Sequence, residues 1–160
     1  MPTIAVTVYD FVLTIHILAV VVAFGVVFAY AIIDTHVKRA GPGDLAALHR
    51  LHVVLARRLI TPAMTVVLLA GLYLALDRWS LGDPWISATF AILIVLFGLT
   101  GAVLTPADER LAELAERDAK AGGAPSAEYE RAAQRANAFG GLALLLVIVA
   151  IFLMVAKPGM

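Results

Sequence analysis

The chain has 160 residues, of which 62% are hydrophobic and only 15% are charged, and its formal net charge is zero. Soluble domains are roughly half apolar and about a quarter charged, so this composition indicates a membrane protein. The zero net charge gives no support for nucleic-acid binding. The chain has no cysteine, which excludes disulfides, thiolate metal ligands and cysteine catalysis.

Four nearly uncharged stretches predict four transmembrane helices, because roughly 20 apolar residues cross the hydrocarbon core of a bilayer. The stretches cover residues 11–33, 59–76, 85–104 and 138–156. Their apolar residues are continuous rather than alternating, which argues against strands. The first stretch lacks a basic leader and a small-residue cleavage site, so we expect it to remain as the first helix. We predict an all-α, antiparallel four-helix membrane bundle that forms one domain over residues 1–160.

The basic residues predict how the bundle is oriented. Lysine and arginine gather in the loops 34–58 and 105–137, and the other side has only Arg78 and Lys157. Loops rich in lysine and arginine stay in the cytoplasm. We therefore expect both of these loops to be cytoplasmic, both termini to lie outside, and the protein to contact lipid in the cell (plasma) membrane.

Both cytoplasmic loops are predicted to be helical. Asp44 can cap a helix that runs into the second span, where Pro62 bends or restarts it. Thr105 begins an amphipathic helix that ends at the glycine pair 122–123. Ser126 caps a further helix that continues into the fourth span. These segments are helical extensions of the spans.

The apolar side of the amphipathic helix contains Leu111 and Leu114. Three placements suit such a helix. It can lie on the membrane surface, it can pack on the other cytoplasmic helix, or it can be a solvated connector.

His16 is an ionisable residue within the first apolar stretch. On a helix, five polar or small residues fall within about 40° of one direction: Tyr9, His16, Ala23, Tyr30 and Asp34. This side should face the bundle interior. Ionisable residues inside a membrane are functional-site hypotheses by default. A neutral imidazole can ligate a metal or haem iron, relay a proton, or hydrogen-bond a neighbouring helix.

If His16 binds iron, its partner ligand must come from elsewhere, because His36 lies about 30 Å further along a straight helix. Met154 has a plausible depth in the fourth span. A second His16 from another chain or an open coordination position are the alternatives. Tyr9, Tyr30 and Trp85 are candidates to line the haem pocket.

The remaining histidines suggest a second candidate site. His49 and His52 are three residues apart, so they share a helix face. With His36, and with Asp34 or Asp44, they can form a metal site. The alternative is a solvated polar surface beside the arginines that face lipid headgroups.

Two segments resemble a known family. LTIHILAVVVAFGVVFAYAIIDTH (residues 13–36) and ARRLITPAMTVVLLAGLYLAL (residues 56–76) are similar to the first two spans of the HemJ-type membrane protoporphyrinogen oxidases. These oxidases are grouped with the copper-resistance D proteins. The shared features are an early histidine, a glycine about ten residues later, a histidine at the cytoplasmic end, and RRLITPAM with a later Gly-Leu: His16, Gly25, His36, residues 57–64, Gly71 and Leu72. The ending FLMVAKPGM (residues 152–160) looks more like a sister family of predicted integral membrane proteins, which would cover essentially the whole chain.

The resemblance implies a four-helix bundle and binding of b-type haem through His16. The oxidases also have a lysine, and commonly further histidines, in and around the third span. Here WISATFAILIVLFGLTGAVLT (residues 85–105) has neither. This difference leaves open whether the protein is an enzyme.

Three hypotheses follow. The protein has a redox or haem-handling role, with His16 as axial ligand and a quinone or a partner protein exchanging electrons. Alternatively, it is an accessory or structural subunit, or a homo-oligomeric scaffold, and His16 is a buried hydrogen-bonding residue. A third hypothesis is a small-solute or metal transporter that depends on His36, His49 and His52.

Overall fold

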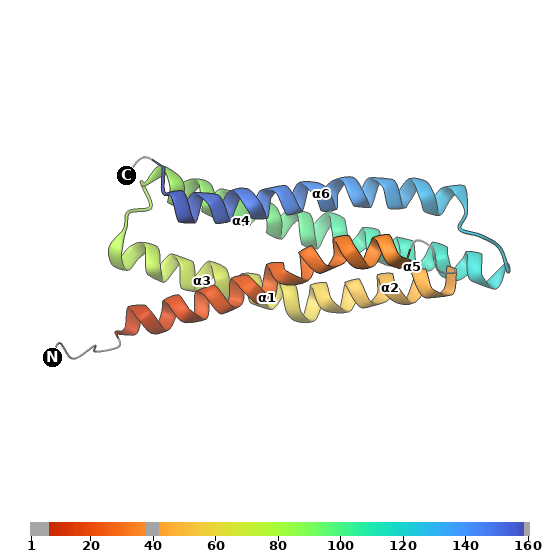
Figure 1. Ribbon diagram of the computed structural model, residues 1–160, viewed down its shortest axis with the longest axis horizontal. Helices are drawn as coiled ribbons and strands as arrows, with labels where there is room; N and C mark the ends of the chain where they lie inside the picture. The colour runs from red at the N-terminus through yellow and green to blue at the C-terminus, as the bar shows by residue number, and fades with distance from the viewer. Residues whose placement is uncertain (1–6, 38–41, 159–160) are drawn as a thin grey trace.

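The computed structural model describes residues 7–37 and 42–158, which form helices and turns and contain no strand. In chain order the elements are α1 (Val8–Val37), α2 (Pro42–Leu55), the π-helical turn η1 (Ala56–Ile60), α3 (Thr61–Arg78), α4 (Pro84–Gly98), the π-helical turn η2 (Leu99–Leu104), α5 (Thr105–Lys120) and α6 (Ala127–Ala156). Figure 1 shows long helices that lie side by side, with the start of α1 and the end of α6 at the same end of the molecule.

Within the described ranges, four helical stretches are long and apolar enough to cross a membrane: Val8–Tyr30, Pro42–Arg78, Pro84–Lys120 and Ala127–Ala156. Large apolar side chains remain exposed on them, such as Leu18 at 60%, Leu69 at 61% and Ile94 at 64%. Such exposure suits helices whose outer surface contacts lipid. The prediction of an all-helical protein with four candidate spans is therefore confirmed.

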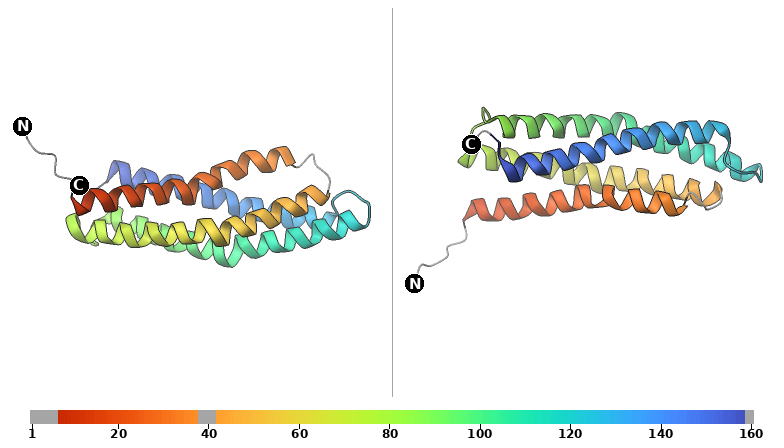
Figure 2. Two further views of the ribbon diagram at one scale, coloured as in Figure 1. Left: turned by 90° about the horizontal axis from the view of Figure 1, so that it is seen from below. Right: turned by 45° about the horizontal axis from the view of Figure 1, so that its top comes forward.

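The second and third of these stretches are each continuous through a π-helical turn. In each turn a threonine that precedes a proline donates its backbone N–H to the carbonyl five residues earlier, Thr61 to Ala56 and Thr105 to Thr100. Proline has no N–H and its ring crowds the preceding turn, so the regular hydrogen-bond ladder is interrupted there. The helix takes one π-helical turn before each Thr-Pro pair and then continues as an α-helix. Figure 2 shows that each of the two helices is continuous.

Local signals in the sequence place the end of α5 and the start of α6. Gly122 has a φ of 68° and follows the end of α5, and glycine adopts this left-handed conformation without steric cost. The Ser126 side chain accepts a hydrogen bond from the Tyr129 backbone N–H at 3.3 Å and caps α6. Asp44 lies inside the first turn of α2, which begins at Pro42, so its charge complements the helix dipole rather than capping the helix.

The amphipathic helix α5 packs on another helix. Leu111 and Leu114 are 1% and 2% exposed and form a cluster with Leu45 and Ala46 of α2 and Tyr129 of α6. Of the three placements predicted for this helix, the structure therefore shows packing on the helix of the other basic loop, α2. The α2–α5 contact is what brings the polar side chains of these two helices together.

Candidate functional sites in two adjoining cavities

Two cavities of about 290 Å³ each lie inside the described part of the molecule. We call them the His16 cavity, which is lined by His16, Met154 and Trp85, and the Asp108 cavity, which is lined by Asp108, His49 and His52. The side chains of Phe24, Leu96 and Val147 line both cavities. A single layer of apolar side chains therefore separates the two.

His16 is held by the backbone of a neighbouring helix. Its side chain is only 6% exposed, and its Nδ1 lies 3.1 Å from the carbonyl oxygen of Val67 on α3. A carbonyl oxygen can only accept a hydrogen bond, so Nδ1 carries the hydrogen and Nε2 keeps its lone pair. This tautomer satisfies a buried donor and leaves a nitrogen that can act as a ligand.

Gly71 provides the space for the imidazole. A Cβ atom at this position would lie 3.1 Å from Cε1 of His16 and 3.5 Å from its Nδ1. The first distance is closer than an ordinary van der Waals contact. The absence of a side chain at Gly71 therefore lets the Cε1–Nδ1 edge of the ring approach α3, within reach of the Val67 carbonyl.

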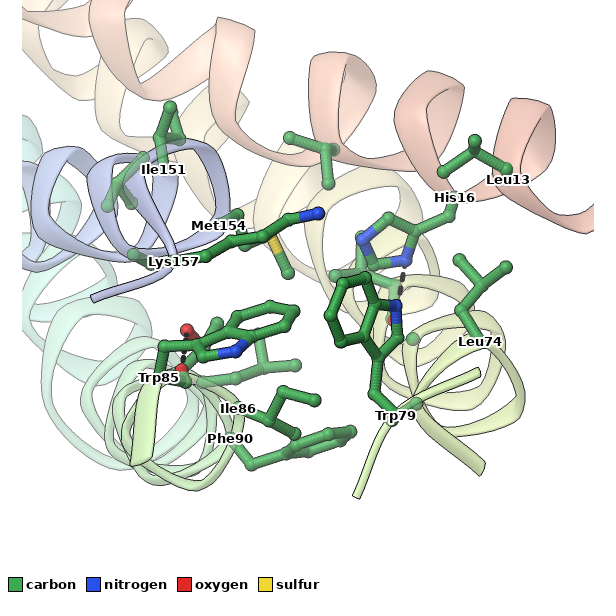
Figure 3. A pocket seen from close by; sticks show the side chains of 18 of the residues that line it. Leu13, His16, Leu74, Trp79, Trp85, Ile86, Phe90, Ile151, Met154 and Lys157 are labelled. Atoms are coloured by element: carbon green, nitrogen blue, oxygen red, sulfur yellow. Dashed lines mark hydrogen bonds between the residues drawn. The ribbon is translucent and has the colours of Figure 1, made fainter. Parts of the chain in front are cut away.

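The rest of the His16 cavity is mainly aromatic and apolar. Figure 3 shows His16 entering from α1, Met154 and Lys157 from the end of α6, and the rings of Trp79 and Trp85 beside them. The Lys157 ammonium lies 4.3 Å from the centre of the Trp79 ring, a cation–π contact. Among the described residues, the buried indole N–H of Trp85 has no hydrogen-bond partner.

The structure places the predicted haem-site residues in different cavities. Tyr9 and Met154 line the His16 cavity together with His16, as the sequence suggests. Tyr30 instead lines the Asp108 cavity, where its ring centre lies 3.9 Å from that of His52. Two turns of helix separate Tyr30 from Ala23, and this distance along α1 carries it past the layer that divides the cavities.

The Asp108 cavity contains a convergent polar group. The Oδ1 atom of Asp108 lies 2.7 Å from Nδ1 of His49 and 3.4 Å from Nδ1 of His52. On its other side the His49 ring contacts the Tyr129 hydroxyl, at 2.9 Å from Nε2. His49 and His52 are 8% and 4% exposed, and the Asp108 side chain is 21% exposed. Three potential metal-ligand atoms, one from each residue, lie within 4.8 Å of one another.

Of the proposed partners for His49 and His52, Asp44 is exposed and does not belong to this group. The side chains of His36 and Asp34 lie outside the described part of the structure. Asp108 was not among the residues that the sequence singled out. One signal points to it, because Asp108, Leu111, Ala112 and Ala115 share a helix face by their spacing, and the last three are buried. A carboxylate on the buried face of an amphipathic helix requires a polar partner.

An all-helical fold with four candidate spans and histidines facing internal cavities defines an integral membrane protein. The chain belongs to a family described as predicted integral membrane protein (DUF2269), whose family model matches residues 10–158. No curated protein and no solved structure matches the chain. The expected membership of a family of predicted integral membrane proteins is confirmed, and the kinship with the copper-resistance D and HemJ-type proteins stays a prediction.

Proposed function

We propose that the protein binds b-type haem in the His16 cavity, with His16 as an axial ligand, and serves a redox or haem-handling role. The observation that carries this proposal is the hydrogen bond from Nδ1 of His16 to the Val67 carbonyl oxygen. Histidines that ligate metals usually donate their other ring N–H to a carbonyl or carboxylate, which fixes the tautomer and the ring orientation. His16 has this arrangement before any ligand is added.

The other lining residues suit a planar, partly anionic group. Trp79 and Trp85 offer flat apolar surfaces, and the Met154 thioether would be available as a further iron ligand. The Lys157 ammonium and the Trp85 indole N–H offer donors for carboxylate substituents. When bound, haem would supply one-electron chemistry, and the protein would tune it through the axial ligands and burial.

The cavity volume also suits a smaller aromatic ligand. About 290 Å³ is close to the lower end of the range for ligand pockets, roughly 300–1,000 Å³. A quinone head group is therefore the other redox ligand to test. An absorption spectrum distinguishes haem from a quinone, because only haem gives a Soret band.

A second candidate function rests on the same hydrogen bond. The contact between His16 and Val67 ties α1 to α3 at a buried position. On this alternative the protein is an accessory or structural subunit, as a homo-oligomer or with a membrane-protein partner, and His16 serves only as an internal contact. The two candidates differ in whether the cavity binds a coloured cofactor.

The test is an absorption spectrum of the detergent-purified protein, oxidised and dithionite-reduced, for wild type, His16→Ala and His52→Ala. Haem ligation predicts a Soret band and reduced α and β bands that His16→Ala abolishes and His52→Ala retains. His52 is the matched control because it is a buried histidine of the other cavity. No band in wild type after haem is added back, together with a lower melting temperature for His16→Ala, would favour the structural alternative.

We further propose that the four stretches form an antiparallel bundle in the plasma membrane, with both termini outside and the loops 34–58 and 105–137 cytoplasmic. The clustering of lysine and arginine in these loops supports this orientation. Because the chain has no cysteine, single cysteines can be labelled without background. In intact cells an impermeant maleimide should label Ser80→Cys and spare Ser126→Cys. The reverse pattern would invert the topology.

A further inference from the structure

We propose that His49, His52 and Asp108 bind one divalent transition-metal cation, of the Zn²⁺ or Fe²⁺ type, between α2 and α5. This inference concerns the Asp108 cavity and does not depend on haem binding in the His16 cavity. The ligands would be two imidazole nitrogens and one carboxylate oxygen. The Tyr129 hydroxyl would hydrogen-bond the ring nitrogen of His49 that does not bind the metal.

The ligand atoms of the three residues converge between α2 and α5. The two Nδ1 atoms, from adjacent turns of α2, lie 2.7 Å and 3.4 Å from the same carboxylate oxygen on α5. Ligands at about 2.0–2.2 Å from a tetrahedral zinc ion lie a little over 3 Å apart. Small movements of these side chains would therefore admit an ion between the two Nδ1 atoms and the carboxylate oxygen, which lie within 4.8 Å of one another.

The three side chains are also of the chemical types that bind transition metals. Two histidines and one carboxylate form the protein ligands of many zinc and non-haem iron sites that keep open coordination positions. The cavity beside the three residues gives room for water or a small ligand at such a position. None of the described residues that line this cavity is a lysine or arginine, so a bound cation would meet no basic side chain there.

Tyr129 supports His49 from the side of the ring that faces away from Asp108. The Tyr129 hydroxyl lies 2.9 Å from Nε2 of His49, and a hydroxyl can either donate or accept a hydrogen bond. Without metal, Nδ1–H of His49 donates to Asp108 and the hydroxyl donates to Nε2. With metal on Nδ1, the ring hydrogen moves to Nε2 and donates to the Tyr129 oxygen. The Tyr129 contact therefore survives metal binding and holds the ring in place.

His52 is oriented by packing. Its ring lies against the Tyr30 ring, with the centres 3.9 Å apart, and its side chain is almost fully buried. The two π-helical turns flank the group, since η1 follows α2 and η2 precedes α5. Single π turns inside α-helices occur frequently at functional sites.

The test is titration of the full-length, chelator-treated protein in detergent with Co²⁺, followed by its visible d–d absorption, and then displacement by Zn²⁺. Wild type should bind one equivalent saturably. Asp108→Asn and His52→Gln should each weaken binding at least about tenfold. Glu109→Gln is the matched control, because Glu109 is the adjacent, exposed carboxylate and pairs with Arg57. It should leave the titration unchanged.

Two results would overturn the proposal: no saturable Co²⁺ binding by wild type, or equal binding by wild type and Asp108→Asn. Loss of binding in His16→Ala with retention in Asp108→Asn would also overturn it, because the ion would then occupy the other cavity. If the variants fail to fold, as judged by size exclusion, X-ray absorption of the Zn²⁺-loaded wild type decides. The expected first shell contains only nitrogen and oxygen and shows the outer scattering of two imidazoles. A shell without imidazole scattering would contradict the site.

Discussion

The two cavities hold their histidines in different ways. In the His16 cavity a single imidazole bonds to a backbone carbonyl on the next helix, and the surroundings are aromatic and apolar. In the Asp108 cavity two imidazoles, a carboxylate and a phenol bond to one another across three helices. The first arrangement needs one polar side chain, while the second needs several that must all be in place.

This difference follows from the surroundings of each site. In the apolar surroundings of His16 each added polar side chain carries a desolvation cost. A backbone carbonyl that is already present satisfies the imidazole without adding one. At the Asp108 cavity the carboxylate side chain is 21% exposed, and contact with water lowers its desolvation cost. The His16 site therefore depends on the α1–α3 contact, and the Asp108 site depends on the packing of α2, α5 and α6.

The largest effect is expected from Leu111→Ala. Leu111 is 1% exposed in the cluster that joins α2 to α5, and truncating a buried leucine costs about 2–5 kcal/mol. The variant should unfold earlier in thermal melts in detergent and should bind Co²⁺ more weakly. Leu51→Ala, at a leucine of α2 that is 51% exposed, is the control and should change little. Equal loss in both variants would contradict the role of the α2–α5 contact.

Tyr129→Phe should have the next largest effect. It removes the hydroxyl next to Nε2 of His49 and leaves a buried polar atom without that partner, which costs about 1–3 kcal/mol. Melting temperature and Co²⁺ affinity should both fall, and the spectrum of the His16 cavity should not change. Tyr73→Phe, at a tyrosine that is 41% exposed, is the matched control. A change in the haem spectrum of Tyr129→Phe would show that the two cavities are coupled.

A smaller effect is expected from Gly71→Ala, and it should be confined to the His16 cavity. The new Cβ would lie 3.1 Å from Cε1 of His16 and displace the ring from the Val67 carbonyl. Replacing glycine in a helix by itself stabilises by about 0.5–1 kcal/mol. Gly25→Ala isolates that gain, since nothing lies within 4 Å of a Cβ there. Gly71→Ala should therefore melt at a lower temperature than Gly25→Ala, and the difference measures the clash with the His16 ring. Equal stabilisation of both variants would contradict a close contact between Gly71 and His16.

The smallest effect is expected from Arg57→Gln. Arg57 and Glu109 form an ion pair whose side chains are 64% and 42% exposed, and such surface pairs contribute about 0–1 kcal/mol. Thermal melts at low and high salt should differ little from wild type. A large loss would mean that this pair between η1 and α5, rather than the buried cluster, holds the two helical extensions together.

Much of the fold follows from local sequence. The number of candidate spans comes from apolar runs of membrane length, and the end of α5 and the start of α6 come from Gly122 and Ser126. The inward placement of His16 follows from helical periodicity, since His16 and Ala23 are buried and Gly25 is exposed on the other side. Each of these features depends on residues within a few turns of one another.

The sites follow from sequence only in part. Periodicity identified His16, and a spacing of three identified His49 and His52 as neighbours. Neither could assign Asp108, which lies 56 residues after His52 and reaches it only because α5 packs on α2. Periodicity also grouped Tyr30 with His16, although the layer of Phe24, Leu96 and Val147 divides them between cavities.

The sequence by itself thus determined an all-helical membrane protein with four candidate spans and one buried histidine in the first of them. The tertiary structure decided which groups meet that histidine, which carboxylate joins the other two, and that two separate cavities exist. The physical reason is the distance along the chain over which each interaction acts. Hydrophobic length, helix caps and periodicity act within one helix, whereas hydrogen bonds such as that between His16 and Val67 form only after separate helices have packed.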